Sequence, residues 1–521
     1  MNQSEIDVLA DRHLRQDPDG VLSDVTGHRA GIVLIEVGET LAASTGIQHL
    51  AWMLTNVLAR QFKLVGLIVL DVPEVPLASG VAAFGTDATL ARSLAECVRL
   101  VAGPHVRVRN RRAGDDQSAD VVLSIGVPQA QGSRQYHLYA DGWRFAVSKS
   151  ADLPVVPPGS SLALGPYMCA SFAAGEVFKI LRGLQPGRGT FVEHMFSSLW
   201  SMTGASKWGD LLDGPSAAAI PDLGHFYMAG AGAVAQAAAA CLGASSLSAS
   251  CTAVDADPLD TSNDNRYVLA TRGDDGKSKT DLVAAYLRSR GIKVVIAPVW
   301  WEDFVGRRGG FTTDESIRAL ELKHRFPVIL SCVDKNRPRH AIQNVLPELI
   351  VGGSTHGLIA TASVFDPVAS SACLKCHNPP ESRDEILAAR IAQLKTATDD
   401  RRSELMQQWS LTAEDVDKLL NPSGKCGQLT AEDVNRFAAD VPVMSVGFVS
   451  LASGVLLVAQ WLRHLAAGDG LNAVATETAL AAFTRPKVRT RKNGFDATCA
   501  CGKGGRDRWI EFWRPRSGSH E

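Results

Sequence analysis

The chain has 521 residues, 45% of them hydrophobic and 21% charged, with a formal net charge of −2 at pH 7. This length exceeds one ordinary hydrophobic core and predicts two or three domains. The near-neutral charge gives no sign of nucleic acid as the main partner. Ten cysteines are too few for a disulfide scaffold, so their clustering indicates metal or thiol chemistry in a reducing cytoplasm.

The first predicted element is a short amphipathic helix over residues 5–16, inside an N-terminal arm of residues 1–27. This segment is polar and charged, which argues against a secretory signal. The helix ends in a cluster of basic residues that includes Arg15.

Residues 28–205 show the alternation of apolar strands and helices that is typical of a mostly parallel sheet covered on both faces. Strands are expected at 31–36, 64–71 and 120–126, and a helix at 47–62. The strand ends lack phosphate-binding chemistry, because one glycine and the acid Glu39 follow the first strand and no aspartate follows the third.

Residues 206–221, with their Gly, Ser and Ala, are predicted to link this domain to a second one over residues 222–380. The second domain opens with a strand at 225–229, a turn containing Gly230 and Gly232, and an alanine-rich helix. Glycines allow close approach of backbone to phosphate, and a helix N-terminus offers free N–H groups. The turn alone is equally typical of simple packing.

Further polar residues follow this turn. The next strand ends at Asp255 and Asp257, where an acid can bind ribose hydroxyls. A strand at 326–330 leads into Asp334. Asn263, Arg266 and Lys279, which add hydrogen-bond donors and positive charge, lie between these two strands in the sequence.

This series resembles the ThiF/MoeB superfamily, which includes the enzymes that activate ubiquitin-like proteins. The shared pattern is Gly-x-Gly-x-x-Gly, Asp-x-Asp, Ser-Asn-x-x-Arg, a lysine, then Asp-x-x-x-x-Arg. Here Ala235 replaces the third glycine, and Arg339 has the spacing of the last arginine, with Arg337 as the alternative. The resemblance implies an α/β fold of two Rossmann-like ThiF-type domains, the first inactive and the second active, forming a pseudo-dimer within one chain.

The resemblance also implies roles in binding ATP and Mg²⁺. Asp334 would hold the magnesium ion, a cation that prefers oxygen ligands. Arg15 would reach the ATP of a neighbouring adenylation domain, although an ordinary solvated helix face is the alternative. The nucleotide-binding set is Gly230, Gly232, Asp255, Asp257, Asn263, Arg266, Lys279 and Asp334.

Two small-residue-rich helices, at 164–179 and 446–457, indicate a degenerate internal repeat; an unrelated first α/β domain is the alternative. The second helix belongs to an uncharged run, 441–462, that is long enough to span a bilayer. Its serines, glycines and glutamine favour a buried core helix, so we expect no membrane segment. Residues 441–490 would continue the active domain.

Cys373 and Cys376 have metal-ligand spacing, and thiolate-bound zinc needs four donors. The remaining clustered pair, Cys499 and Cys501, lies in a tail of residues 491–521, and superfamily relatives also carry a second pair far downstream. Their pair is Cys-x-x-Cys, so His377 is a possible substitute ligand. Four free thiols are the alternative to a structural Zn²⁺ site.

Residues 381–440 break the α/β pattern and are predicted to form an exposed, charged helical insertion with little deep apolar periodicity. Near its end, Cys426 stands beside Lys425 in a Gly/Ser-flanked segment. Thioester-forming relatives carry their nucleophile in such a crossover segment, which implies that Cys426 is the catalytic thiol. A loop cysteine without a role is the alternative. The remaining cysteines fit core positions: Cys97, Cys169, Cys241, Cys251 and Cys332.

Together these features predict an ATP-dependent activating enzyme. It would adenylate the C-terminal glycine of a ubiquitin-like protein, form a thioester on Cys426 and pass it to a conjugating enzyme. Bacterial relatives imply a conjugation system linked to phage defence. The alternatives are an adenylyltransferase of a sulfur carrier or peptide without a thioester step, a NAD-binding oxidoreductase and an inactive scaffold.

Overall fold

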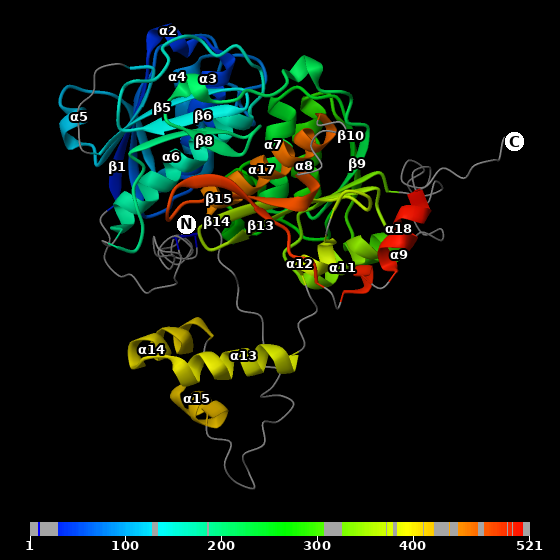
Figure 1. The fold of residues 1–521 in the computed structure, drawn as a ribbon. Helices are drawn as coiled ribbons and strands as arrows, with labels where there is room; N and C mark the ends of the chain where they lie inside the picture. The colour runs from blue at the N-terminus through cyan, green and yellow to red at the C-terminus, as the bar shows by residue number, and fades with distance from the viewer. Residues whose placement is uncertain are drawn as a thin grey trace, which may run out of the picture.

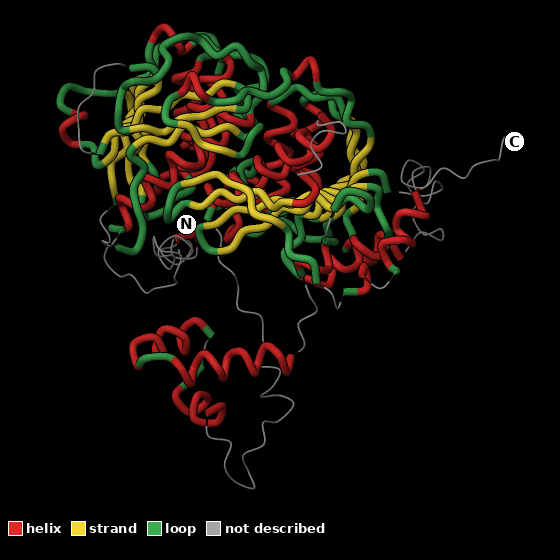
Figure 2. Tube along the Cα trace, in the orientation of Figure 1, coloured by secondary structure: helices red, strands yellow, loops and turns green. Residues whose placement is uncertain are grey.

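Two α/β halves lie side by side, and a small group of helices stands apart from both (Figures 1 and 2). Arg15 and Cys426 lie outside the described residues, so their roles stay predictions. The computed structural model describes residues 9–10, 30–127, 134–184, 187–306, 326–370, 372–378, 383–409, 411–420, 437, 446–466, 474–496, 499–502 and 504–513.

The first half contains an eight-stranded sheet of order β3-β2-β1-β4-β5-β6-β7-β8. Its central strand β1 reads GIVLIEV and is largely buried, as expected for a strand covered on both faces. The strands are β1 (Gly31–Val37), β2 (Val65–Asp71), β3 (Arg107–Asn110), β4 (Val121–Ile125), β5 (Gln135–Asp141), β6 (Arg144–Ser148), β7 (His194–Ser198) and β8 (Thr203–Ala205). The helices are α2 (Glu39–Ala42), α3 (Thr45–Ala59), α4 (Leu90–Ala102), α5 (Asp115–Ser118) and α6 (Leu164–Arg182).

The second half repeats this design in a sheet of order β11-β10-β9-β12-β13-β14-β15-β16. Its strands are β9 (His225–Ala229), β10 (Ser250–Val254), β11 (Lys293–Ala297), β12 (Val328–Ser331), β13 (Leu349–His356), β14 (Ile359–Phe365), β15 (Glu477–Ala482) and β16 (Lys487–Lys492). The helices of this half are α7 (Ala233–Ala244), α8 (Lys279–Ser289), α9 (Trp301–Gly306), α11 (Asn336–Asn344), α12 (Leu374–His377), α17 (Gly447–Ala466) and α18 (Gly505–Trp513).

The two strand orders correspond position by position, which confirms two Rossmann-like domains in one chain. The equivalent helices α6 and α17 pack on each other, and the Ser171 hydroxyl donates a 2.6 Å hydrogen bond to the Phe448 carbonyl. Neither sheet is parallel throughout, because its last three strand pairs are antiparallel. A two-residue turn joins β5 to β6, and so short a connection permits only antiparallel pairing.

Helix α17 is the apolar run predicted as a core helix. In the described part of the chain it alone is long and apolar enough to cross a membrane. However, 89% of its most apolar 18-residue stretch is buried inside the protein. It lies against α7, α6 and β14. A Cβ added to Gly454 would lie 2.5 Å from the Ala237 Cβ, so the small residue permits the close crossing of α17 and α7.

The insertion is helical as predicted and consists of α13 (Arg383–Thr396), α14 (Asp399–Gln408) and α15 (Ala413–Leu420). These helices share a small core that includes Leu394, Leu405 and Leu419. They therefore bury apolar surface among themselves, apart from the two sheets (Figure 1).

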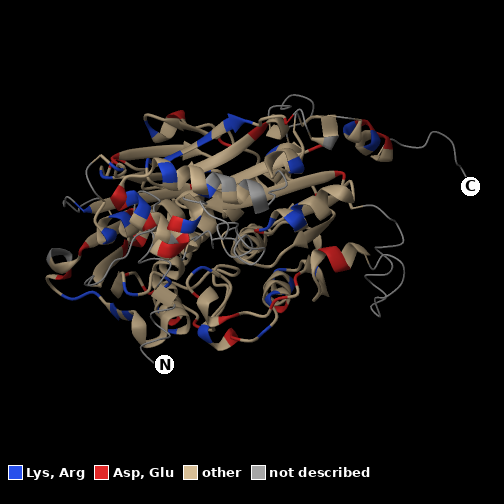
Figure 3. Ribbon diagram, turned by 90° about the horizontal axis from the view of Figure 1, so that it is seen from below, with Lys and Arg blue, Asp and Glu red and all other residues tan. Residues whose placement is uncertain are grey.

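Acidic and basic residues are interspersed over the molecule rather than separated onto opposite sides (Figure 3).

Candidate functional site

The main cavity, of about 780 Å³, lies where β9, β10 and β12 end. From β9 the chain continues on one side to β10, and β12 pairs with β9 on the other side, so this is the point where the strand order reverses. Open α/β sheets bind ligands at such a point. Seven of the eight predicted nucleotide-binding residues line this cavity: Gly230, Gly232, Asp255, Asp257, Arg266, Lys279 and Asp334.

The glycine turn forms one wall of the cavity. Gly230 has a φ of +87°, a conformation that favours glycine, and an added Cβ would lie 3.1 Å from the Cys332 carbonyl oxygen. Gly232 is the N-cap of α7 and gives that helix no side-chain cap. The first N–H groups of α7 therefore face the cavity without a capping side chain, as an anion site requires.

Asp255 holds the glycine turn in place. Its carboxylate accepts hydrogen bonds from the Ala231 N–H at 2.6 Å and the Asp257 N–H at 2.9 Å. Burial raises the pKa of Asp255, and the two backbone hydrogen bonds oppose that rise. The carboxylate predicted to bind ribose thus also links the turn to the end of β10.

Two cations that line the cavity lie near the Tyr267 ring. The Arg266 guanidinium carbon lies 5.2 Å from the ring centroid and the Lys279 Nζ lies 5.8 Å from it. Lys279 donates a 2.8 Å hydrogen bond to Asp257. Burial lowers the pKa of Lys279, but Tyr267 and the hydrogen bond to Asp257 outweigh it, so the pKa is raised and the amine is charged at neutral pH.

Asp334 is exposed just beyond β12 and lines the cavity, a position from which a carboxylate can reach a phosphate-bound cation. Arg337 also lines this cavity and forms a 3.4 Å ion pair with Glu302. Arg339 instead lines a smaller hollow and donates to the Asn378 side chain at 2.7 Å. Asn263 is buried and is not among the residues that line the cavity, and its amide donates to the Ser262 hydroxyl.

Sequence reasoning missed several residues that line the cavity, among them Tyr267, Trp300 and Ser450. Tyr267 is the ring near both cations, Trp300 offers a half-exposed indole beyond β11, and Ser450 comes from α17. Tyr267 directly follows Arg266 in the motif, so its place could have been inferred. Trp300 and Ser450 carry no local signal, because only the fold brings them to the strand ends.

The equivalent strand ends of the first half are occupied by the protein's own charges. Glu36 is buried and accepts hydrogen bonds from Arg111 at 2.9 Å and the Ser124 hydroxyl at 2.5 Å. Arg111 also donates to Asp71 at 2.6 Å. A buried carboxylate and its paired arginine therefore stand at the strand ends of the first half, whereas those of the second half carry a glycine turn and a lysine.

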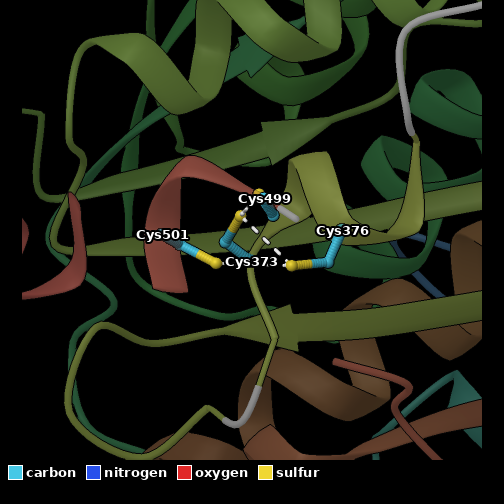
Figure 4. A group of neighbouring side chains, drawn as sticks. All are labelled: Cys373, Cys376, Cys499 and Cys501. Atoms are coloured by element: carbon cyan, nitrogen blue, oxygen red, sulfur yellow. Dashed lines mark hydrogen bonds between the residues drawn. The ribbon is translucent and has the colours of Figure 1, made fainter. Parts of the chain in front are cut away.

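Four thiols lie together where α12 meets the C-terminal tail (Figure 4). Cys373 lies 3.8 Å from Cys376 and 3.6 Å from Cys499, Cys376 lies 3.3 Å from Cys501, and all four sulfurs are within 4.8 Å of one another. Tetrahedral zinc with bonds of about 2.3 Å needs sulfurs about 3.8 Å apart, so the group fits such a metal. The hydrogen bond from Cys373 lowers the pKa of the Cys376 thiol. His377 is not in the group; its ring lies against Phe365.

The two sheets, with a cavity where the strand order of the second one reverses, define an α/β protein of two Rossmann-like domains. Residues 222–501, more than half of the chain, match the ThiF family, and the chain belongs to that family. Residues 32–191 match the BilD N-terminal domain.

Similar proteins include y4jF of Sinorhizobium fredii (strain NBRC 101917 / NGR234), which is 30% identical over 298 residues. The match covers 55% of this chain and 52% of y4jF, so the chain spans about half the length of that relative. A structure of E. coli MccB with AMPCPP and selenomethionine MccA shows 12% identity over 53% of this chain and 66% of that chain, with a TM-score of 0.34. Selenomethionine PaaA shows 15% identity over 52% and 73%, with a TM-score of 0.32.

Proposed function

We propose that this chain is an ATP-dependent adenylating enzyme that activates the C-terminal glycine of a ubiquitin-like protein. The observation that carries the proposal is the gathering of a glycine turn, Arg266, Lys279 and Asp334 around one cavity at the point where the strand order reverses. Adenylation requires this combination, because the barrier is repulsion between a carboxylate and a triphosphate.

In the proposed reaction a carboxylate oxygen of the partner attacks the α-phosphorus of ATP, and the bond to pyrophosphate breaks. The turn at Gly230 and the N-terminus of α7 bind phosphate oxygens. Arg266 and Lys279 offset the negative charge that the attack brings together. Asp334 would hold Mg²⁺, which when bound neutralises phosphate charge.

The proposal continues with a second step at Cys426. Its thiolate attacks the carbonyl carbon of the adenylate, AMP leaves, and the thioester is passed to a conjugating enzyme. The first half acts as the inactive partner of a pseudo-dimer, with Arg15 reaching the nucleotide, and zinc on the four cysteines holds the tail. The sequence resemblance supports this step and a place in bacterial antiphage conjugation.

Exchange of labelled pyrophosphate into ATP tests the adenylation step. We expect exchange that depends on Mg²⁺ and on a ubiquitin-like protein that ends in glycine. The same partner without its last glycine is the control and should support no exchange. Absence of exchange together with binding of NAD would contradict the proposal and favour an oxidoreductase.

Cys426→Ala separates the two steps. We expect this variant to keep pyrophosphate exchange and to lose a covalent adduct with the partner that thiol reagents cleave. Cys97→Ala, which alters a buried thiol of α4, should keep both. If the unaltered chain exchanges pyrophosphate but forms no adduct, the function is adenylation of a sulfur carrier or peptide without a thioester.

A further inference from the structure

Arg60, which directly follows α3 in the first half, is almost fully buried against the second half, with 1% of its surface exposed. Its guanidinium donates to the Asp264 carbonyl and to the Ala270 carbonyl, each at 2.6 Å. Its Nε donates to the Asn56 side chain at 2.8 Å. The planar guanidinium thus joins both ends of one short segment of the second half.

Asn56, one turn earlier in α3, holds the middle of the same segment. Its amide donates to the Val268 carbonyl at 2.8 Å. Two side chains of the first half therefore satisfy three buried carbonyls between residues 264 and 270. Unsatisfied buried carbonyls are costly, so these bonds specify the path of the segment.

The segment between these carbonyls carries the cation and the ring of the cavity. Arg266 lies between its first two anchors, and its guanidinium donates to the Ser262 carbonyl at 2.7 Å and to the Asn265 side chain at 3.0 Å. Tyr267 follows, and the Arg266 guanidinium carbon and the Lys279 Nζ lie 5.2 Å and 5.8 Å from its ring centroid. A shift of the segment backbone would move both side chains at once.

Burial lowers the pKa of Arg60 to about 10, so the guanidinium remains charged at neutral pH. Three of its N–H groups have acceptors of fixed direction, namely two carbonyls and one amide oxygen. Lysine cannot reproduce this fork, because its single ammonium group cannot reach carbonyls at both ends of the segment in the same geometry.

We propose that Arg60 and Asn56 are positioning residues, through which the first half sets the geometry of Arg266 and Tyr267 in the nucleotide cavity. The inference rests on the proposed function for the ligand, but the contacts it depends on lie within the chain. According to this inference, the first half, which has no nucleotide site of its own, helps to build the site of the second half.

The test compares Arg60→Met with Arg290→Met in the full-length chain. Arg290 is the matched control, because it also joins the halves through a hydrogen bond to the Ala82 carbonyl but lies outside the cavity. Binding of Mg²⁺ and the ATP analogue AMPPNP is measured by calorimetry below the melting temperature. We expect the Kd to rise at least tenfold in Arg60→Met and less than twofold in Arg290→Met, with Arg60→Lys close to Arg60→Met.

Hydrogen–deuterium exchange of peptides covering residues 261–270 is the second readout and needs no ligand. We expect these amides to exchange at least tenfold faster in Arg60→Met and unchanged in Arg290→Met. If Arg60→Met does not fold, Asn56→Ala replaces it and should raise both values by about threefold.

Equal Kd values and equal exchange in Arg60→Met and the unaltered chain would overturn the inference. If the unaltered chain binds no AMPPNP, the proposed function fails, while the exchange of residues 261–270 still decides whether α3 positions the segment.

Discussion

At the scale of single residues, Lys279 is a cation of the cavity whose position is fixed by several contacts. It is mostly buried, bonded to Asp257 and placed beside Tyr267. Lys279→Ala should lower pyrophosphate exchange by about 10²–10³-fold, the loss that follows removal of one preorganised charge-stabilising donor. The exchange rate at saturating ATP is the measurement.

Lys277 provides the control for this change. It lies two residues earlier, is exposed, and pairs with Asp274 outside the cavity. Lys277→Ala should keep exchange within about twofold, since the exposed Lys277 does not line the cavity. Equal losses in the two variants would show that Lys279 does not act on the nucleotide.

Asp264 gives a pH prediction at the same scale. Its side chain is 3% exposed, Oδ1 has no hydrogen-bond partner among the described residues, and burial raises its pKa from 3.8 to about 6. The folded state therefore holds this proton more tightly than the unfolded state. The resulting stability is present below about pH 4 and is lost as the pH rises through about 6.

Asp264→Asn removes this titration. Relative to the unaltered chain, the variant should gain stability on going from pH 4 to pH 8, by up to about 3 kcal/mol for a shift of about two pKa units. Urea unfolding at both pH values measures the difference, and other titrating groups cancel in the comparison. A difference that does not change with pH would contradict the assignment to Asp264.

At the scale of elements, the four cysteines connect α12 to the C-terminal α18. Trp509 and Trp513 of α18 donate indole N–H groups to the Pro347 and Leu346 carbonyls. We expect about one zinc per chain by elemental analysis. Cys373→Ser should lose it, lower the melting temperature and expose α18 to proteolysis, because the metal closes a loop of more than a hundred residues.

Cys251→Ala is the matched control for this change, since it alters a buried thiol of β10 that is not in the group. It should keep the metal. Retention of zinc in Cys373→Ser, or its absence from the unaltered chain, would contradict a four-cysteine zinc site.

The elements also show which parts of the fold the sequence could predict. Strands β1, β2 and β9 are continuous apolar runs, and their positions were predicted within a residue or two. Strand β13 reads LIVGGSTH and was missed, because its small polar residues line a hollow and give no alternating pattern. The antiparallel strands β5 to β8 were missed for a related reason, since polar residues such as Gln135 and His137 are satisfied only inside the folded sheet.

The residues of the site also fall into those that a local motif could place and those that it could not. Lys279 and Asp334 follow a local motif and could be placed from the sequence. Arg60 could not, because its partner Asp264 lies 204 residues away and no local pattern joins them. Long-range contacts between the halves depend on how the two sheets pack. No single segment of the sequence determines that packing.

At the scale of the whole molecule, two halves with the same strand order present different chemistry. The strand ends of the first half hold the buried Glu36 and its partner Arg111, and those of the second hold the cavity. Calorimetry should therefore find one bound nucleotide per chain. Lys279→Ala should weaken this single event, and a second event that survives the change would contradict an inactive first half.

The described backbone runs without a break from β8 of the first half to β9 of the second. Separate subunits of a dimer part on dilution, but two bodies joined by about twenty residues keep a high effective concentration of each other. If Arg60 and Asn56 position the cavity as proposed, a site that depends on both halves stays intact however few copies of the protein a cell contains.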